Sequence, residues 1–293
     1  MILITGGTGF IGQYVVREMI EKGCDMRLLA RDEKKAQAFS SKLEVFKGDA
    51  TNPESLKGIE KDVDVLVHMI GAISLNPKEN FLYNLQTTKN ILKCCKNVEK
   101  IIYTSSADVY GPVTGIADES CECKPNNPYG TSKLQAEKML LDSGIPSLIL
   151  RPTLVYGINS PWWKYGMDLL KWGFVPDTDN YTQLVHVKDV SRAITMGIKK
   201  GKGTYIIADE KPIKITDLFS LTVTLLGKKP RKVPLWFAKM GGVLMNKGEY
   251  FDVALTNRVF STKKASEKLG FHTRCNFDSE FKNMVDWYKN LHK

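Results

Sequence analysis

Apolar and polar residues alternate in blocks along the first half of the chain. Short apolar runs predict strands at Met1–Thr5, Met26–Ala30, Leu43–Phe46, Val63–His68, Lys100–Ser105 and Ser147–Leu150. Amphipathic stretches between them predict helices at Ile11–Lys22, Glu33–Ser40, Glu79–Lys96 and Tyr129–Asp142, with a short turn near Pro53–Leu56. The strands are rich in Val, Ile and Leu and show little polar alternation, as expected when both faces of a sheet are covered. The pattern predicts an α/β fold with a doubly wound parallel sheet.

The pattern loosens after Leu150, where Pro161, Gly173, Pro176 and Pro212 mark loops. Further strands are expected near Gln183–Val187 and Thr204–Ile207, and helices at Ile215–Leu225, Leu235–Met245, Thr262–Leu269 and Asp278–Leu291. This half is predicted to form a smaller lobe, interleaved with the last elements of the core.

Four glycines follow the first predicted strand, and a predicted helix follows them. Gly7, Gly9 and Gly12 satisfy the spacing G-x-G-x-x-G. Glycines at these positions let the backbone turn tightly and approach a pyrophosphate, and the helix N-terminus presents N–H groups to the phosphates. The motif predicts a dinucleotide-binding domain over residues 1–155 and a substrate-binding lobe over residues 156–293. A glycine-rich turn in another kind of α/β protein is the alternative.

Tyr129 and Lys133 lie four residues apart at the start of a predicted helix, directly after Asn127 and Pro128. Residues at this spacing share a helix face. A lysine ammonium beside a phenol favours the phenolate, which lowers the pKa of the tyrosine. Such a tyrosine can exchange a proton with a substrate hydroxyl.

Ser106 and Asp108 follow the fifth predicted strand. In open α/β sheets, ligands bind outside the carboxyl ends of the strands. Two residues apart in extended chain, both side chains would face the same side. Ser106 is a candidate to hydrogen-bond a substrate oxygen. Asp108 is a candidate general base, or it caps the next turn.

Composition and charge bear on which partners the protein binds. The chain has 293 residues, 43% of them hydrophobic, and a formal net charge of +10 from scattered lysines. Such a charge is typical of a solvated surface, or it attracts an anionic substrate or cofactor. No aromatic–basic tract of the RNA-binding type occurs, so we expect no nucleic-acid partner.

The cysteines and the apolar runs bear on location. The six cysteines lack zinc-ligand spacing, so free thiols and no metal are expected. A strand beginning at Met1 leaves no room for a signal peptide, and no apolar run reaches the roughly 18 residues of a membrane span. We expect a cytoplasmic protein without membrane contact.

These motifs together resemble the extended short-chain dehydrogenase/reductase family, the NAD-dependent epimerase/dehydratase group. The resemblance rests on Thr5–Gly12 (phosphate loop), Ser105–Gly111 (serine motif), Tyr129–Lys133 (catalytic pair), Leu150–Gly157, Val185–Val190, Asn84–Asn90 and Ser261–Gly270. It implies a Rossmann-type fold and an enzyme that moves a hydride between a nicotinamide and a carbinol or carbonyl carbon.

The resemblance also implies residue roles. Tyr129 is the acid/base, Lys133 lowers its pKa and holds the nicotinamide ribose, and Ser106 orients the reacting oxygen. The implied cofactor contacts, besides Tyr129 and Lys133, are Gly6, Thr8, Gly9, Phe10, Ile11, Gly12, Arg31, Asp49, Ala50, Gly71 and Ala72.

The residue that binds the adenosine ribose distinguishes NAD from NADP. An acid is expected there, about 20 residues after the glycines, and alignment to the family puts Ala30 at that place. Ala30 accepts no hydroxyl hydrogen bond, and the following Arg31 can pair with a 2′-phosphate. NADP(H) is therefore favoured over NAD(H). The alternative is that Arg31 faces solvent and Asp32 takes the ribose.

The substrate stays open between two classes. Nucleotide-sugar members of the family carry an asparagine where this chain has Leu154, and they have an Arg-x-Gly-Asp element where this chain has Gly248–Asp252. A nucleotide-sugar epimerase leads, with an NADPH-dependent reductase or dehydrogenase of a small non-sugar carbonyl compound close behind. A non-catalytic NADPH-binding module is the third reading.

The helices at Glu79–Lys96 and Tyr129–Asp142 resemble the pair that forms a dimer interface in relatives, so a homodimer is expected.

Overall fold

The centre of the fold is one parallel sheet of seven strands. The computed structural model describes residues 1–41, 43–72, 77–236 and 256–291. Within them the strand order is β12-β7-β5-β4-β1-β2-β3. The strands are β1 (Ile2–Thr5), β2 (Met26–Ala30), β3 (Glu44–Lys47), β4 (Val65–His68), β5 (Lys100–Thr104), β7 (Ser147–Pro152) and β12 (Gly203–Ile207). The order turns back at β1, which pairs with both β2 and β4, and this is the switch point where such sheets bind ligands.

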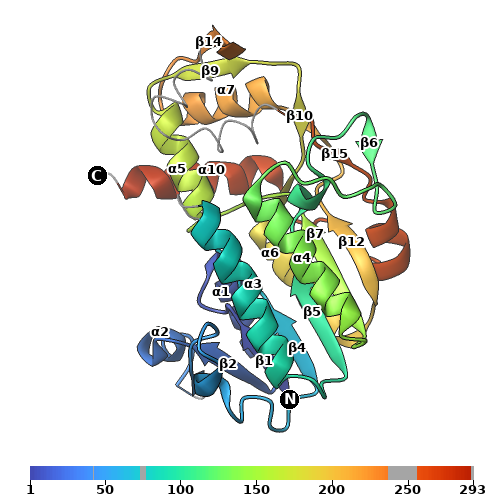
Figure 1. The fold of residues 1–293 in the computed structure, drawn as a ribbon. Coiled ribbons are helices and arrows are strands. Elements are labelled where there is room, and N and C mark those ends of the chain that lie inside the picture. The colour runs from blue at the N-terminus through green and yellow to red at the C-terminus, as the bar shows by residue number, and fades with distance from the viewer. Residues whose placement is uncertain (42, 73–76, 237–255, 292–293) are drawn as a thin grey trace.

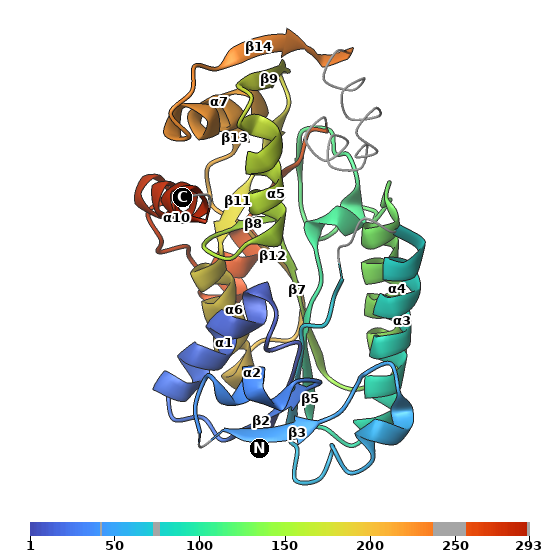
Figure 2. The ribbon, with the colours of Figure 1, turned by 90° about the vertical axis from the view of Figure 1, so that its left-hand side faces the viewer.

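Helices cover both faces of this sheet (Figure 2). One face carries α1 (Phe10–Glu21) and α6 (Val187–Lys199); the other carries α3 (Pro77–Cys94) and α4 (Pro128–Asp142). Successive residues of β1 serve the two faces, since Ile4 packs with the α1 and α6 side chains and Leu3 with those of α3 and α4. Both are fully buried. This explains why the strands read as continuous apolar runs.

A smaller lobe sits above the carboxyl ends of the central strands (Figure 1). Its helices are α5 (Pro161–Leu170), α7 (Ile215–Leu225) and α10 (Phe277–Asn290). Trp163, Met167, Leu218 and Phe281 form its apolar core. The short strand pairs are β8 (Leu154–Tyr156) with β11 (Leu184–His186), β9 (Phe174–Asp177) with β14 (Arg231–Pro234), β10 (Tyr181–Thr182) with β13 (Ile213–Lys214), and β6 (Ile116–Ala117) with β15 (Val259–Phe260).

The short helical elements are α2 (Glu33–Gln37), η1 (Pro53–Leu56), η2 (Ala107–Tyr110) and η3 (Ala265–Leu269).

The predicted α/β class and the doubly wound parallel sheet are confirmed. Two helices, α5 and α6, were not predicted, and η3 is a π-type turn where a longer helix was expected. Most of the helix expected at Leu235–Met245, and all of Gly248–Asp252, lie outside the described residues.

All six cysteines are free thiols. Among the described residues no helix combines the length and the apolar character that crossing a membrane requires.

Candidate active site

The glycine-rich loop joins β1 to α1 and leaves no room for a side chain at Gly6 or Gly12. Gly6 has φ +77°, and a Cβ there would lie 2.8 Å from the backbone of Ile70. The Gly9 amide donates to the Gly6 carbonyl at 3.0 Å. A Cβ on Gly12 would lie 2.1 Å from the same carbonyl oxygen. The loop is thus folded tightly against the first turn of α1.

The first turn of α1 has the features of a phosphate site. Gly9 is its N-cap, no side chain caps the helix, and no acidic residue lies in the first turn. Thr8 and Gly9 are exposed, and Phe10 and Ile11 are partly exposed. Unpaired N–H groups at a helix N-terminus bind anions, so this loop fits a dinucleotide pyrophosphate.

The neighbouring strand ends provide further predicted cofactor contacts. Ala30 ends β2 and is buried, whereas Arg31 is exposed. Asp32 caps α2, since its Oδ1 accepts from the Lys35 amide at 3.3 Å. The carboxylate of Asp49 accepts from the amide and hydroxyl of Thr51, both at 2.9 Å.

A buried asparagine fixes the segment after β4. The Asn84 side chain accepts from the Ala72 amide at 2.7 Å and donates to the Ala72 carbonyl at 3.3 Å. It also donates to the Ser132 hydroxyl at 3.1 Å, which donates in turn to the Tyr129 carbonyl at 2.7 Å. Asn84 therefore ties the Gly71–Ala72 backbone to the first turn of α4.

Tyr129 and Lys133 lie together on the first turns of α4. Asn127 caps this helix and Pro128 occupies its first turn. The Nζ of Lys133 lies 5.9 Å from the Tyr129 ring centroid and donates to the Thr104 carbonyl at 2.9 Å. Lys133 is 2% exposed.

Burial changes the pKa values of both groups. It lowers the pKa of Lys133 to about 8, against the opposing effect of the Glu137 carboxylate. It raises the pKa of the Tyr129 phenol above its ordinary value. The expected lowering of the phenol pKa by Lys133 is therefore not found in this arrangement, because desolvation disfavours the phenolate and the ammonium donates to backbone carbonyls.

Ser106 and Asp108 form the turn after β5. The Ser106 Oγ caps η2 by accepting from the Asp108 amide at 3.1 Å, an arrangement that leaves its hydroxyl able to act as a donor as well. The capping function considered for Asp108 belongs to Ser106. The Asp108 carboxylate instead forms an ion pair with Arg258, which lies 150 positions later.

A buried ionic network behind the turn was missed at the sequence level. Glu137 accepts from Arg151 at 2.9 and 2.5 Å and from the Ser105 hydroxyl at 2.5 Å. Arg151 also donates to the Tyr110 hydroxyl at 2.6 Å. Glu137 lies four residues after Lys133, on the same helix face, and that spacing was the available signal.

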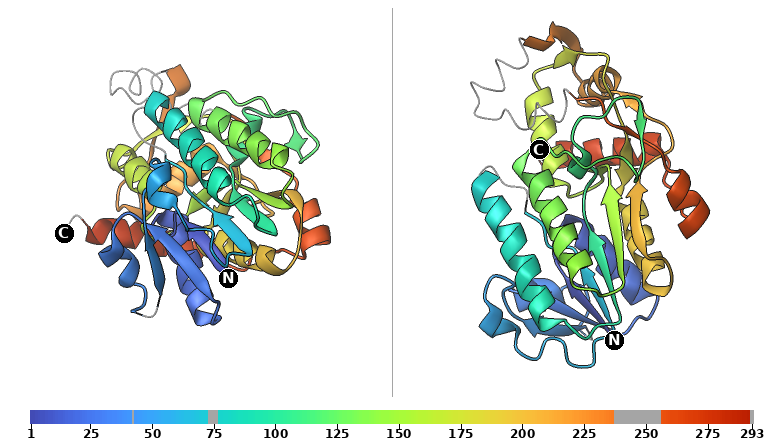
Figure 3. Two further views of the ribbon diagram at one scale, coloured as in Figure 1. Left: turned by 60° about the horizontal axis from the view of Figure 1, so that its bottom comes forward. Right: turned by 45° about the vertical axis from the view of Figure 1, so that its right-hand side comes forward.

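The structure therefore brings the predicted groups to one edge of the sheet. The phosphate loop follows β1, Gly71 follows β4, and Ser106 follows β5; a Cβ on Gly71 would lie 2.7 Å from the Lys133 Nζ. Helices α3 and α4, which supply Asn84 and Tyr129, run side by side over one face of the sheet (Figure 3).

The family follows from this fold and site together with the match to a family model. Residues 2–208 match the model of the NAD dependent epimerase/dehydratase family, and the chain belongs to that family. It is an enzyme of the extended short-chain dehydrogenase/reductase type.

Two relatives match four fifths or more of the chain at low identity. A putative UDP-glucose 4-epimerase of Methanocaldococcus jannaschii is 28% identical over 315 aligned residues, covering 99% of each chain. The human 3 beta-hydroxysteroid dehydrogenase type 7 is 24% identical over 80% of this chain and 76% of its own.

Solved structures share the fold. The UDP-glucose 4-epimerase of Thermotoga maritima, solved with UDP-glucose, superposes with a TM-score of 0.82 at 22% identity, covering 100% of this chain and 99% of its own. The UDP-glucose 4-epimerase of Thermus thermophilus, solved with NAD, gives 0.80 at 22% identity, with 98% of each chain covered.

Proposed function

We propose that this protein is an NAD(P)-dependent epimerase of nucleotide sugars. The observation that carries the proposal is the meeting of the Ser106 turn and the Tyr129–Lys133 pair with the phosphate loop at one edge of the sheet. A cofactor whose pyrophosphate binds the first turn of α1 would extend across the strand ends toward Tyr129.

The residues present fit a nicotinamide dinucleotide. The backbone excludes a side chain at Gly6 and Gly12, and the helix N-terminus above them is uncapped. When bound, the nicotinamide supplies the site that accepts and returns a hydride. The remaining chemistry falls to protein groups.

In its phenolate form, Tyr129 would take the proton of the substrate hydroxyl as the carbon is oxidised. It would become the neutral phenol and give the same proton back on reduction. Ser106 would donate its hydroxyl proton in a hydrogen bond to the same substrate oxygen and hold that oxygen in place. Lys133, with a pKa near 8, would carry positive charge at neutral pH. Its ammonium, 5.9 Å from the Tyr129 ring centroid, would partly offset the desolvation that disfavours the phenolate. An epimerase oxidises the carbon from one face of the substrate and reduces it from the other, so the proton is taken once and returned once.

The choice of substrate rests on the relatives. The Methanocaldococcus relative covers almost the whole chain and is named a putative UDP-glucose 4-epimerase. A reductase or dehydrogenase of a non-sugar compound is the second candidate, favoured by Leu154, which packs against the apolar core of the lobe. The 3 beta-hydroxysteroid dehydrogenase relative agrees with that reading.

For the cofactor, we favour NADP(H). Ala30 offers no acceptor for a ribose hydroxyl, Asp32 is engaged as a helix cap, and Arg31 is exposed beside them.

We also propose a homodimer through α3 and α4. Leu82 and Leu141 on these helices are 65% and 61% exposed, which suits a covered face. Sedimentation at several protein concentrations tests the dimer.

The experiment that separates the candidates is a turnover assay on a panel of nucleotide sugars and non-sugar carbonyl compounds. An epimerase converts UDP-glucose with no net change in the absorbance of the reduced cofactor, and chromatography shows the epimer. A reductase consumes the reduced cofactor in proportion to product. No turnover of any nucleotide sugar, combined with stoichiometric cofactor consumption on a carbonyl compound, would replace the first proposal with the second.

A further inference from the structure

A charged contact ties the serine turn to a distant segment of the chain. Arg258, directly before β15, forms an ion pair with Asp108. The Arg258 side chain is 7% exposed and that of Asp108 is 21% exposed. The pair lies at the base of the turn that carries Ser106.

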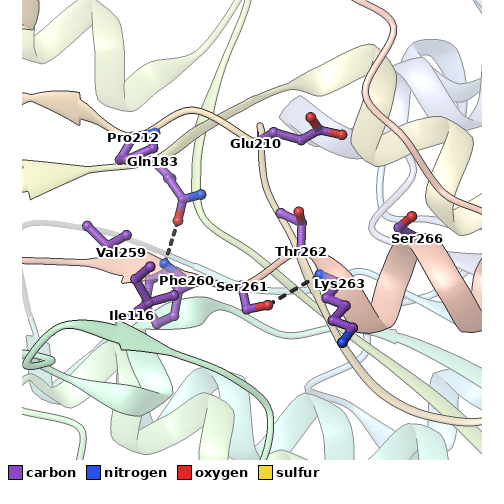
Figure 4. A pocket seen from close by; sticks show the side chains of 10 residues that line it. All are labelled: Ile116, Gln183, Glu210, Pro212, Val259, Phe260, Ser261, Thr262, Lys263 and Ser266. Atoms are coloured by element: carbon purple, nitrogen blue, oxygen red, sulfur yellow. Dashed lines mark hydrogen bonds between the residues drawn. The ribbon is translucent and has the colours of Figure 1, made fainter.

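Arg258 is itself held firmly. Its amide donates to the Tyr181 carbonyl at 2.8 Å, and its Nε donates to the Thr256 hydroxyl at 3.0 Å. Two residues on, the Phe260 amide donates to the Gln183 Oε1 at 2.5 Å (Figure 4). The Phe260 ring packs against Tyr110, the last residue of η2, with 5.4 Å between ring centroids. The segment around β15 therefore contacts the turn through both a charge and a ring.

The backbone of Asp108 contacts both Ser106 and the first turn of α4, which carries Tyr129. Its amide donates to the Ser106 Oγ at 3.1 Å. Its carbonyl oxygen lies 2.5 Å from where a Cβ on Gly130 would stand, so its backbone touches the first turn of α4 beside Tyr129. A displacement of Asp108 would move the Ser106 hydroxyl and disturb the packing of Tyr129.

Stability alone does not account for this pair. Burying a guanidinium is costly, and an apolar pair of similar volume is often at least as stable. The Nη2 of Arg258 is buried and has no hydrogen-bond partner in the described part of the chain. Such an unsatisfied group calls for an explanation in terms of geometry or function.

We propose that Arg258 is a positioning residue that holds the Asp108 carboxylate and thereby keeps the Ser106 hydroxyl and the Tyr129 phenol in the geometry of reaction. The proposal rests on the proposed function for its kinetic consequence only. It makes Asp108 an anchor for the turn, and a role for Asp108 as a base is the outcome that would oppose it.

The test compares Arg258→Met, Arg258→Lys, Asp108→Asn and the double variant Asp108→Asn/Arg258→Met. Misplacing a reacting group by about 1 Å costs roughly 10²-fold in rate, so Arg258→Met should lower kcat by about that factor while KM for the cofactor changes by less than about threefold. Arg258→Lys should recover part of the loss. The double variant should lose little more than the worse single variant, because both changes release the same turn.

Arg27 offers a matched control. It is also a buried arginine, paired with Glu44 at 2.6 Å and bonded to the Ile59 and Lys61 carbonyls at 2.8 Å, but at the opposite end of the sheet. Arg27→Met should lower the free energy of unfolding and leave kcat unchanged. Amide hydrogen exchange over residues 105–111 should accelerate in Arg258→Met and not in Arg27→Met.

An unchanged kcat and unchanged exchange in Arg258→Met would overturn the proposal. So would losses in the two single variants that multiply in the double variant, which would mean that Asp108 acts independently, as a base does. If the wild-type protein turns over none of the substrates, the proposed function fails, and the exchange measurement still decides whether Arg258 holds the turn.

Discussion

Replacing Gly12 with alanine should damage cofactor binding, while the same change in another helix should not. Gly12 lies in α1, Gly166 in α5 and Gly197 in α6. A Cβ at Gly12 would meet the Gly6 carbonyl oxygen at 2.1 Å and the Gly7 Cα at 2.6 Å. At Gly197 the nearest atom is a Leu148 methyl at 2.4 Å, and at Gly166 nothing lies within 4 Å.

The magnitudes follow from these contacts. Alanine is favoured over glycine inside a helix by about 1 kcal/mol, and Gly166→Ala should gain up to that amount of stability. At Gly12 the clash is with backbone, so α1 and the loop must separate by about 1 Å, at an overpacking cost of about 1–3 kcal/mol. The helix N–H groups would then no longer converge with the loop on one phosphate position. A loss of about 1.4 kcal/mol or more in cofactor binding, at least about tenfold in Kd, is expected. Gly197→Ala meets a flexible side chain and should fall between the two in stability, with normal binding.

Fluorescence titration with NADH and NADPH measures the affinities, and urea denaturation measures the free energies of unfolding. Wild-type cofactor affinity in Gly12→Ala, or equal loss of affinity in Gly166→Ala, would refute the assignment of the α1 N-terminus as the phosphate site.

Three further predictions concern charge. Arg151→Met leaves the Glu137 carboxylate buried without its partner and should cost about 3–5 kcal/mol of stability, measured by urea denaturation; a loss below about 1 kcal/mol would contradict this reading of the network. Arg31→Ala should weaken NADPH binding by about tenfold and leave NADH binding nearly unchanged, since it removes a partner for the 2′-phosphate; equal effects on both would remove the case for NADP(H). Because burial lowers the pKa of Lys133 from 10.5 to about 8, the unfolded chain binds more protons between those pH values. The free energy of unfolding should therefore rise with pH across that window in the wild type relative to Lys133→Met, and parallel pH profiles would contradict the shift.

The sequence predicted the central sheet because its signals are local. An apolar run followed by glycines and an amphipathic stretch encodes β1, the phosphate loop and α1 without reference to the rest of the chain. The lobe was harder to predict. Pro161 marked a loop in the sequence analysis, yet it opens α5, where Ser160 caps the helix by accepting from the Trp163 amide at 3.3 Å. A proline is tolerated in the first turn, where its missing N–H has no partner to lose.

In the candidate site, too, some residues could be predicted from local sequence signals and others could not. Tyr129, Lys133 and Ser106 follow recognisable strand and helix boundaries, and the structure places them at one sheet edge. Arg258 could not have been found, since its contact with Asp108 depends on how β15 packs against the turn. The raised pKa of the Tyr129 phenol could not be predicted from the sequence either. Burial raises this pKa, and burial depends on tertiary packing.

The most direct test of the proposed chemistry is a rapid-mixing experiment with cofactor-loaded protein and UDP-glucose. Transient absorbance of the reduced nicotinamide should form in the wild-type protein and should be slower by about 10²- to 10⁴-fold in Tyr129→Phe, with cofactor affinity unchanged. Equal rates in the two proteins would show that the phenol does not move the proton, and the account of this site would then be wrong.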